Sequence, residues 1–283
     1  MIWRCRNRVF DSSQRTLVMG IVNVTPDSFS DGGRFLEPRS AVAHARRLAA
    51  EGADLIDLGA ESTRPGSRPV PAEEQLRRLL PVVLELAKDG FDLSVDTASA
   101  AVAAQALEAG AVAINDVTAL GDPAMAAVVS GAGAGLVLMH MRGTPATMQD
   151  EPRYEDAPRE VRDWLAAQLE AAGRAGIAAE CVALDPGIGF GKAVRHNLEL
   201  LARLEELAAL GRPVLVGASR KSFLGKLLDV PVDQRLEAGL AAAAVAVFLG
   251  AAIVRTHDVA ATIKAVRIAE ALRGARRSAV PAG

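Results

Sequence analysis

Polar residues that could do chemistry stand at the ends of short apolar runs along the whole chain. Asp96, Asn115 and Asp185 each close one such run. Carboxylate and amide oxygens accept hydrogen bonds, and the Asn amide also donates. Such a set suits a flat heterocycle that carries several ring N–H and amino groups. Each residue could instead cap a following helix or bind turn backbone, as Asp96 could within Asp96-Thr97-Ala98-Ser99.

Two later segments are rich in groups that bind anions. They read GASRKSFLG (217–225) and RTHDV (255–259). Their donors and positive charges are Ser219, Arg220, Lys221, Ser222, Arg255 and His257. Because arginine grips phosphate oxygens in a bidentate manner, these segments predict a phosphate site. The alternatives are solvated basic turns and, for Lys221, a Schiff-base nucleophile.

The segment DPGIGFGK (185–192) combines an acid, three glycines, a phenylalanine and a lysine. Glycine lets the backbone approach a ligand closely, so the segment predicts a tight loop that faces a ligand. It lacks the spacing and the terminal Lys-Ser/Thr of a P-loop. Phe190 is either the wall of a ring-binding site or a packing staple. His140, in HMRGTP, is a candidate for orienting a loop.

Oxygen ligands cluster after the first apolar run, where Asn23 is followed by Asp27 and Asp31. Mg²⁺ prefers a few protein oxygens together with water and substrate phosphates. The segment therefore predicts a Mg²⁺ site beside the phosphate site. The stretches NVTPDSFSDGGRF and ESTRPGSRPVP are longer than the roughly 2–6 residues usual in α/β connections, which predicts substrate loops or lids.

The elements that must position these residues alternate regularly. Apolar runs predict strands at 17–22, 54–59, 91–96, 111–116, 135–140, 181–185, 213–217 and 251–255. Helical patterns follow them near 38–51, 72–88, 98–109, 122–130, 155–175, 195–210, 233–249 and 258–273. Eight such units favour an α/β (β/α)8 TIM barrel over a doubly wound sheet. A barrel of this kind places its active site at the carboxyl ends of its strands, where these polar residues stand.

Size and composition agree with a single domain over residues 1–283. The length is close to the roughly 250 residues typical of one barrel, and half of the residues are apolar. Residues 1–14 are interpreted as an N-terminal extension and 275–283 as a disordered tail. A net charge of −2 without long basic runs argues against nucleic-acid binding.

Cysteine usage and apolar stretches bear on the compartment. Cys5 and Cys181 have no Cys or His partner at metal spacing, which favours a reducing compartment. The N-terminal ten residues lack the apolar core of a secretory signal. The stretch 238–254 is interpreted as a buried helix, a stop at Gly250 and a strand, too weakly apolar to span a membrane. A soluble cytoplasmic protein is expected.

Together the motifs resemble the dihydropteroate synthases of folate biosynthesis, from about Leu17 to Leu272. The matching segments are GIVNVTPDSFSDGG, DLGAESTRPGS, SVDT, AINDV, MHMRGTP, DPGIGFGK, GASRKSFLG and RTHDV. Members of this family are transferases that join 6-hydroxymethyl-7,8-dihydropterin diphosphate to p-aminobenzoate. The products are 7,8-dihydropteroate and diphosphate. The resemblance implies an SN1-like displacement through a pterin cation, inhibition by sulfonamides, and a homodimer, for which 238–249 is a candidate surface.

The resemblance also implies a role for each site residue. Asp96, Asn115, Met139, Asp185, Lys221 and Arg255 would bind the pterin. Asn23, Thr63, Arg255 and His257 would bind the diphosphate, with Mg²⁺ at Asn23 and Asp31. Phe29, Pro65, Phe190, Arg220, Lys221 and Ser222 would line the p-aminobenzoate site. The catalytic roles would fall to Asp96, Lys221, Arg255 and His257.

Two other functions share part of this pattern. A pterin-binding methyltransferase barrel would use the same Asp, Asn and Asp set, but would not need the two anion-binding segments or TPDSFSDGG. A non-catalytic paralogue should have lost some of the anion-binding or loop residues, and all of them are present here.

Overall fold

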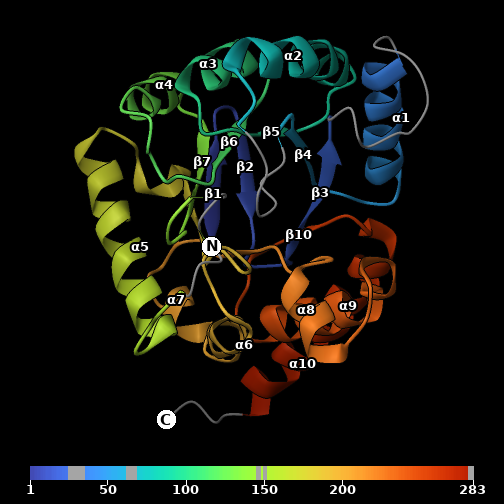
Figure 1. The fold of residues 1–283 in the computed structure, drawn as a ribbon, viewed down its shortest axis with the longest axis vertical. Helices are drawn as coiled ribbons and strands as arrows, with labels where there is room; N and C mark the ends of the chain where they lie inside the picture. Colours follow the sequence, from blue (N-terminus) through green and yellow to red (C-terminus); the bar gives the residue numbers. More distant parts are fainter. Residues whose placement is uncertain (25–35, 62–68, 145–147, 149–151, 280–283) are drawn as a thin grey trace.

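A barrel of parallel strands forms the centre of the molecule (Figure 1). The structure is a computed structural model that describes residues 1–24, 36–61, 69–144, 148 and 152–279. The barrel strands are β3 (Leu17–Asn23), β4 (Leu55–Gly59), β5 (Leu93–Asp96), β6 (Ala113–Asp116), β7 (Gly135–Met139), β8 (Val182–Asp185), β9 (Leu215–Val216) and β10 (Ile253–Thr256). Their order is β8-β7-β6-β5-β4-β3-β10-β9.

The two ends of this sheet meet at a narrow seam. An isolated parallel bridge joins Leu184 to Val214, and the Leu184 amide donates to the Pro213 carbonyl at 2.9 Å. The predicted (β/α)8 barrel is therefore confirmed, and the doubly wound sheet is excluded. The eight predicted strands all agree with observed ones to within two residues at either end.

Helices surround the strands, as Figure 1 shows. They are α1 (Leu36–Ala50), α2 (Ala72–Lys88), α3 (Ala100–Glu108), α4 (Met125–Ala132), α5 (Ala157–Arg174), α6 (Val194–Ala202), α7 (Glu205–Ala208), α8 (Ser222–Leu228), α9 (Leu236–Phe248) and α10 (Val259–Ala279). The helix predicted at 195–210 is thus divided into α6 and α7, and α8 was not predicted. Gly52, Gly90, Gly110, Gly211 and Gly250 follow helices with positive φ, as the sequence pattern predicts.

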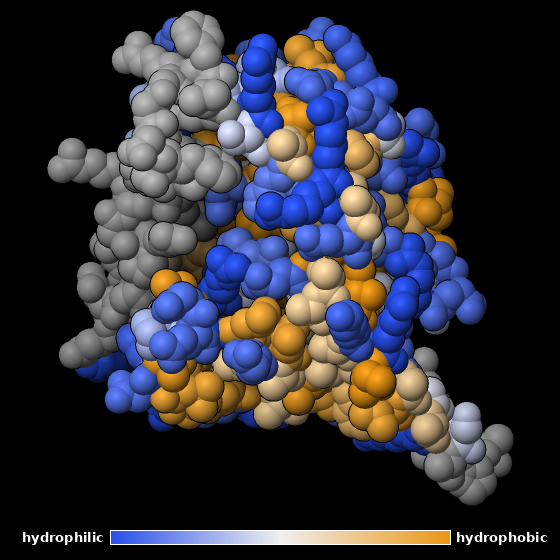
Figure 2. All heavy atoms as spheres, turned by 90° about the vertical axis from the view of Figure 1, so that its right-hand side faces the viewer, coloured by the Kyte–Doolittle hydropathy of each residue, from blue (hydrophilic) through white to orange (hydrophobic). Residues whose placement is uncertain are grey.

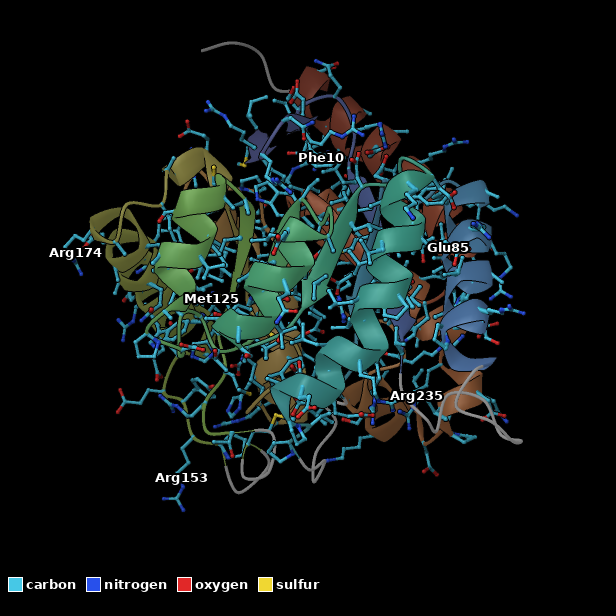
Figure 3. All side chains as sticks on the ribbon, turned by 90° about the horizontal axis from the view of Figure 1, so that it is seen from above. Phe10, Glu85, Met125, Arg153, Arg174 and Arg235 are labelled. Carbon is cyan, nitrogen blue, oxygen red and sulfur yellow. The ribbon has the colours of Figure 1, made fainter. Side chains whose placement is uncertain are left out.

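A hairpin of β1 (Ile2–Cys5) and β2 (Arg8–Asp11) closes the amino-terminal end of the barrel. Trp3 and Cys5 are fully buried beside the inward-facing Met19, Leu55 and Val137. The Trp3 indole N–H donates to the Cys181 carbonyl at 2.8 Å. Figure 3 labels Phe10 of this hairpin at one end of the molecule and Arg153 and Arg235 toward the other. The N-terminal extension expected over residues 1–14 therefore contains a hairpin that packs into the barrel core.

Two further expectations about the chain need correction. Residues 275–279 are not a disordered tail but the last residues of α10, where Arg276 pairs with Glu205 at 3.3 Å and lies 5.3 Å from the Phe248 ring centroid. The helix expected to be buried, α9, is only partly so. It covers the barrel with Ala243, Ala246 and Val247 but exposes Val245.

Within the described residues, no helix is long and apolar enough to cross a membrane.

Candidate active site

The carboxyl ends of neighbouring strands bring the predicted polar residues together. Register partners run from Asn23 to Gly59, from Gly59 to Asp96, and from Asp96 to Asn115. Met139 and Asp185 are partners on β7 and β8. Gly59 lies directly beside Asp96, since a Cβ built on it would be 3.5 Å from the Asp96 Cβ. Residues far apart in sequence thus share one barrel mouth.

Arg255 lies at the centre of the charged residues at this mouth. Its Nε donates to Asp57 Oδ2 at 2.6 Å, and its Nη2 donates to Asp96 Oδ2 at 2.9 Å. Burial alone would lower the pKa of Arg255, but the two carboxylates outweigh it and raise that pKa. The arginine is therefore a permanent cation, held from one side by two acids.

Asp57 lies within the strand predicted at 54–59, but the sequence pattern assigned it no role in the site. Its Oδ2 also accepts from the Asn115 Nδ2 at 3.1 Å. Because a carboxylate only accepts, this contact fixes which end of the Asn115 amide faces away from it. Asn115 Oδ1 and Asp57 Oδ1 are buried polar atoms without hydrogen-bond partners in the described structure. Asn115 therefore offers an acceptor to a ligand.

Asp185 begins the glycine-rich loop at the end of β8. Its Oδ1 accepts from the Gly187 amide at 2.6 Å, so part of its role is to hold the turn. Burial raises the pKa of Asp185, while the Gly187 N–H opposes that rise. Gly187, Gly189 and Gly191 all have positive φ, which explains the spacing of glycines in DPGIGFGK.

Aromatic and sulfur-containing side chains form an apolar wall next to the acids. Met139, Phe190, Val117 and Met148 belong to one buried cluster. The Lys221 ammonium lies 3.9 Å from the centroid of the Phe190 ring, a cation–π contact. Phe190 thus packs within this buried cluster and also presents its ring face to a cation. A flat ring could pack against this surface.

The loops after β9 and β10 meet, as expected for an anion site. Ser219 Oγ and His257 Nδ1 lie 3.0 Å apart, and the His257 amide donates to the same Oγ at 3.3 Å. Arg220 makes a bidentate pair with Asp258, at 3.2 and 2.7 Å. Arg220 itself has a φ of 57°, in the left-handed region. The segments 217–225 and 255–259, which the sequence predicts to bind an anion, therefore contact each other through side chains.

Burial in this mouth shifts the pKa values of an aspartate, a lysine and a histidine. Burial raises the pKa of Asp96 to about 7, an effect that Arg255 opposes. Burial and the neighbouring Arg255 together lower the pKa of Lys221 to about 8. Burial, with Arg220 and Arg255, lowers the pKa of His257 to about 3. The His257 imidazole is therefore neutral at pH 7, and the fixed positive charge of this mouth comes from the arginines.

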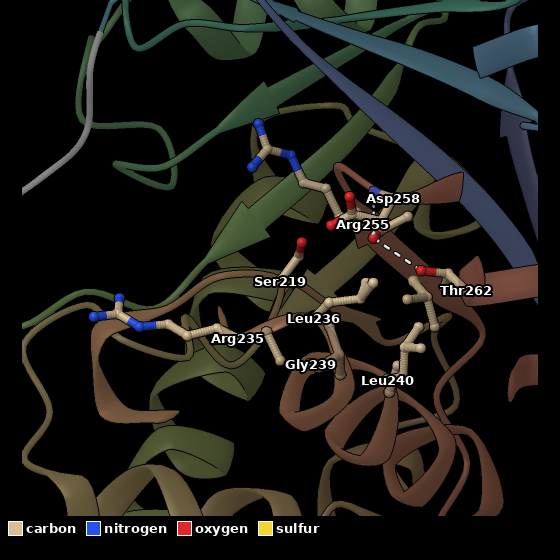
Figure 4. A pocket seen from close by; sticks show the side chains of 13 residues that line it. Ser219, Arg235, Leu236, Gly239, Leu240, Arg255, Asp258 and Thr262 are labelled. Atoms are coloured by element: carbon tan, nitrogen blue, oxygen red, sulfur yellow. Dashed lines mark hydrogen bonds between the residues drawn. The ribbon is translucent and has the colours of Figure 1, made fainter. Parts of the chain in front are cut away.

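A small cavity lies behind the anion loops, between β9, β10 and α9 (Figure 4). Its volume is about 10 Å³, and its lining includes Ser219, Arg235, Gly239 and Asp258. That volume accommodates about one water molecule and no substrate. The Thr256 and Thr262 hydroxyls, 2.9 Å apart, close its wall. The cavity lies behind the two loops and is too small to be the substrate site.

Most predicted site residues therefore converge. The mouth or its rim includes Asn23, Asp96, Asn115, Met139, Asp185, Phe190, Arg220, Lys221, Ser222, Arg255 and His257. Ser99, not Asp96, caps α3, so the alternative role for Asp96 is wrong. Phe29, Asp31, Thr63 and Pro65 lie outside the described residues, as do both long loops for most of their length. The sequence prediction missed roles for Asp57 and Lys192.

Of the two residues expected to bind Mg²⁺, Asn23 lies within the described structure and Asp31 lies outside it. Asn23 is exposed at the end of β3 and provides a hard oxygen. Within the described residues, no group of three or more His, Cys, Asp and Glu side chains could hold a metal ion. A single protein oxygen beside an anion site fits an ion that is completed by phosphate oxygens and water.

Comparisons with known proteins agree with this geometry. Residues 19–257 match the family described as pterin binding enzyme. The dihydropteroate synthase of Escherichia coli K12 is 46% identical over 263 residues, which cover 92% of this chain and 93% of that protein.

Two solved structures are similar over nearly their whole length. The dihydropteroate synthase of Yersinia pestis, in a complex with a sulfonamide drug, has a TM-score of 0.91 and 45% identity, covering 97% of this chain and 100% of that chain. The Xanthomonas albilineans dihydropteroate synthase with 4-aminobenzoic acid has a TM-score of 0.90 and 45% identity, covering 99% of each chain.

Proposed function

The chain belongs to the pterin-binding enzymes, and within them to the dihydropteroate synthases, and from this premise we propose how its barrel mouth performs their reaction. The reaction breaks the bond between the pterin methylene carbon and the diphosphate oxygen. It forms a bond from that carbon to the p-aminobenzoate nitrogen, which loses a proton to solvent. The observation that supports this assignment best is Arg255, held between Asp57 and Asp96 beside the outward-facing acceptor of Asn115.

The pterin is bound by acceptors that face its ring N–H and amino groups. We assign the amino edge to Asp185 and the other ring atoms to Asn115, Asp96 and Lys221, with Met139 packed against the ring. The acceptors are buried or nearly so, and a hydrogen bond to a buried carboxylate discriminates strongly against a ligand that lacks the donor. Arg255 then lies between the ring site and the leaving group.

The leaving group is bound by the loops after β9 and β10. Asn23, Thr63, Arg255 and His257 are assigned to the diphosphate, and Ser219 joins them through its contact with His257. Positive charge placed before the reaction stabilises the developing negative charge without later reorganisation. As the diphosphate departs, the ionised Asp96 stabilises the positive charge left on the pterin. No strong base is needed, because the arylamine nitrogen is itself the nucleophile.

The p-aminobenzoate site is assigned to Phe29, Pro65, Phe190, Arg220, Lys221 and Ser222. Phe190 provides a ring face, and Arg220 with Ser222 at the start of α8 provide donors for the carboxylate. Sulfonamides resemble p-aminobenzoate, so we expect them to compete for this site, as the complex of the Yersinia pestis enzyme suggests.

Mg²⁺ would be held by Asn23 and Asp31 together with the diphosphate, where it would neutralise phosphate charge as a Lewis acid. The residues of this chain would orient the phosphates toward it. The two free cysteines, both buried, fit action in the reducing cytoplasm.

We further propose that the protein is a homodimer that associates through α8, α9 and α10. Exposed apolar side chains on these elements include Leu227, Leu228, Val245, Ile268 and Leu272. Figure 2 shows apolar surface gathered in the lower half of one face, where Figure 1 places α8 and α9. A contiguous apolar surface of this kind marks an interface.

The test is diphosphate release by the purified protein with the dihydropterin diphosphate and Mg²⁺, with and without p-aminobenzoate. We expect release that depends on p-aminobenzoate, together with dihydropteroate. Pterin binding without turnover would instead support a non-catalytic paralogue, and methyl transfer from methyltetrahydrofolate to a corrinoid would support a methyltransferase barrel. Omission of Mg²⁺ should reduce the rate of release.

A further inference from the structure

Lys192 is a buried cation for which the proposed reaction has no use. It is 2% exposed and ends the glycine-rich loop. Its Nζ lies 3.0 Å from His140 Nδ1, and it donates to the His140 carbonyl at 3.2 Å and to the Phe190 carbonyl at 2.8 Å. An ammonium has three N–H donors, so these contacts use all of them.

These contacts fasten the loop after β7 to the loop after β8. The backbones already lie very close, since a Cβ on Gly187 would clash with the His140 carbonyl and one on Gly191 with the Arg142 carbonyl. The Tyr154 hydroxyl donates to the Gly191 carbonyl at 2.9 Å. Lys192 adds a charged side chain to the backbone contacts between these two loops.

The two segments that Lys192 joins carry the two apolar walls of the site. Met139, the wall assigned to the pterin, immediately precedes His140. Phe190, the wall assigned to p-aminobenzoate, has its own carbonyl bound by Lys192. The Phe190 ring in turn faces Lys221. If the distance between these segments changed, the pterin ring would move relative to the p-aminobenzoate ring.

Burying a charged group costs free energy unless the group is well hydrogen-bonded, so packing alone does not explain a lysine at this position. Burial lowers the pKa of Lys192 to about 7; Asp185 opposes this shift, while Lys221 and Arg142 add to it. Burial also lowers the pKa of His140, to about 3, so the imidazole is neutral and its Nδ1 accepts from Lys192. Replacing a buried charge by an apolar side chain of similar volume is often neutral or stabilising.

We propose that Lys192 is a positioning residue, which sets the spacing between the pterin wall at Met139 and the aminobenzoate wall at Phe190 by clamping the two loops. The role rests on the proposed function, because the two rings must meet at one carbon–nitrogen bond. Lys192 touches neither substrate. It acts through the His140 and Phe190 backbones.

The central variant is Lys192→Met, which keeps the length of the side chain and removes its donors. We expect the KM for p-aminobenzoate to rise roughly tenfold and kcat to fall, because a small displacement of reacting groups is costly. The KM for the pterin diphosphate should change less, because the hydrogen bonds of the Lys192 side chain go to His140 and Phe190 and not to Asp185, Asn115 or Asp57. The thermal midpoint should equal or exceed that of the wild type. Lys88→Met, at an exposed lysine at the end of α2, is the matched control and should change nothing.

Hydrogen exchange of the peptide 186–192 gives a readout that does not need turnover. We expect faster exchange in Lys192→Met than in the wild type, and an intermediate rate in Lys192→Gln, whose amide keeps two donors. Wild-type kinetics in Lys192→Met would overturn the proposal. A lower thermal midpoint with an equal rise in both KM values would also overturn it, since this indicates general loosening. If the wild type released no diphosphate, the proposed function would fail, while the exchange data would still test the clamp.

Discussion

Asp57 sets the roles of two other side chains in the barrel mouth. One of its oxygens accepts from both Asn115 and Arg255. The Asn115 amide is therefore held with its oxygen toward the ligand, and the arginine is held through Nε. Because Asp57 has no exposed surface, water cannot replace either contact. Asp57 thus determines which atom of the Asn115 amide faces away from it into the mouth.

We expect Asp57→Asn to reduce kcat/KM for the pterin diphosphate on the order of a hundredfold, because both partners lose their fixed orientation. The KM for p-aminobenzoate should change little. Steady-state kinetics with each substrate varied in turn would measure both effects. Asp54→Asn is the control, since Asp54 pairs with Arg15 at the opposite end of the barrel. Unchanged pterin kinetics in Asp57→Asn would remove Asp57 from the site.

The pH dependence of the reaction should reflect Asp96. Its pKa is raised from 3.8 to about 7, mainly by burial, and the ionised form is the one that stabilises a pterin cation. We therefore expect kcat/KM to fall as the pH drops below about 7. A profile that stayed flat between about pH 5 and 8 would contradict the assigned role.

The raised pKa of Asp96 also makes the free energy of unfolding depend on pH. Between pH 3.8 and about 7, folded Asp96 holds a proton that the unfolded chain has released. The contribution of Asp96 to the free energy of unfolding therefore falls as pH rises through that window. Urea unfolding of the wild type and of Asp96→Asn should show this contribution only in the wild type.

At the residue scale, the sequence predicted the side chains that stand at the last position of a strand. Asp96, Asp185 and Asn115, at or just before such ends, were therefore assigned to the site. Asp57 stands two residues before the end of β4, and so one layer deeper on the inner face. Because side chains alternate along a strand, Asp57 shares the face of Gly59, and this could have indicated that Asp57 points toward the site. For Lys192 no periodic signal existed, since a loop's contacts depend on tertiary packing.

At the scale of elements, the barrel was predictable but the hairpin was not recognised. The strands are continuous apolar runs because both faces are buried. In the hairpin, only alternate residues are buried: Trp3 and Cys5 point inward while Ile2 and Arg4 are exposed. This period of two was visible in IWRC, but the arginines obscured it. Arg4 and Arg8 pair with Glu180 and Asp92 outside the hairpin.

We expect Trp3→Ala to lower the free energy of unfolding by about 3–5 kcal/mol, because it removes a large side chain from a closed core. The KM values should not change, because the hairpin lies at the end of the barrel opposite to the site. Urea unfolding and steady-state kinetics would measure the two. Ile2→Ala is the matched control on the same strand, since Ile2 is 44% exposed. A loss of activity without loss of stability would contradict this separation.

At the scale of the whole molecule, the apolar face on α8, α9 and α10 bears on assembly. α9 and α10 pack against each other, and both present apolar side chains outward. The resemblance to a dimeric family made 238–249 a candidate surface, but the Ala-rich pattern alone predicted burial against the barrel and did not show that α8 and α10 add apolar side chains beside it. A second subunit would complete that burial.

We expect Val245→Glu combined with Ile268→Glu to convert a dimer to monomers, raising the dissociation constant by more than about tenfold. Sedimentation equilibrium over a range of concentrations would measure it. Leu84→Glu, at a 46% exposed leucine on α2, is the control and should leave the association unchanged. A wild type that sediments as a monomer at all concentrations would refute the dimer.

The weak pairing between β8 and β9 means that a bound substrate would add rigidity to the barrel at that point. The barrel is held there by the Leu184–Val214 bridge, and Asp185 and Lys221 follow the two sides of this gap. A pterin bound to both residues would connect the two sides of the gap between β8 and β9. Ligand binding should therefore stiffen the barrel most where its own hydrogen bonding is thinnest. The substrate would then complete the wall that surrounds it.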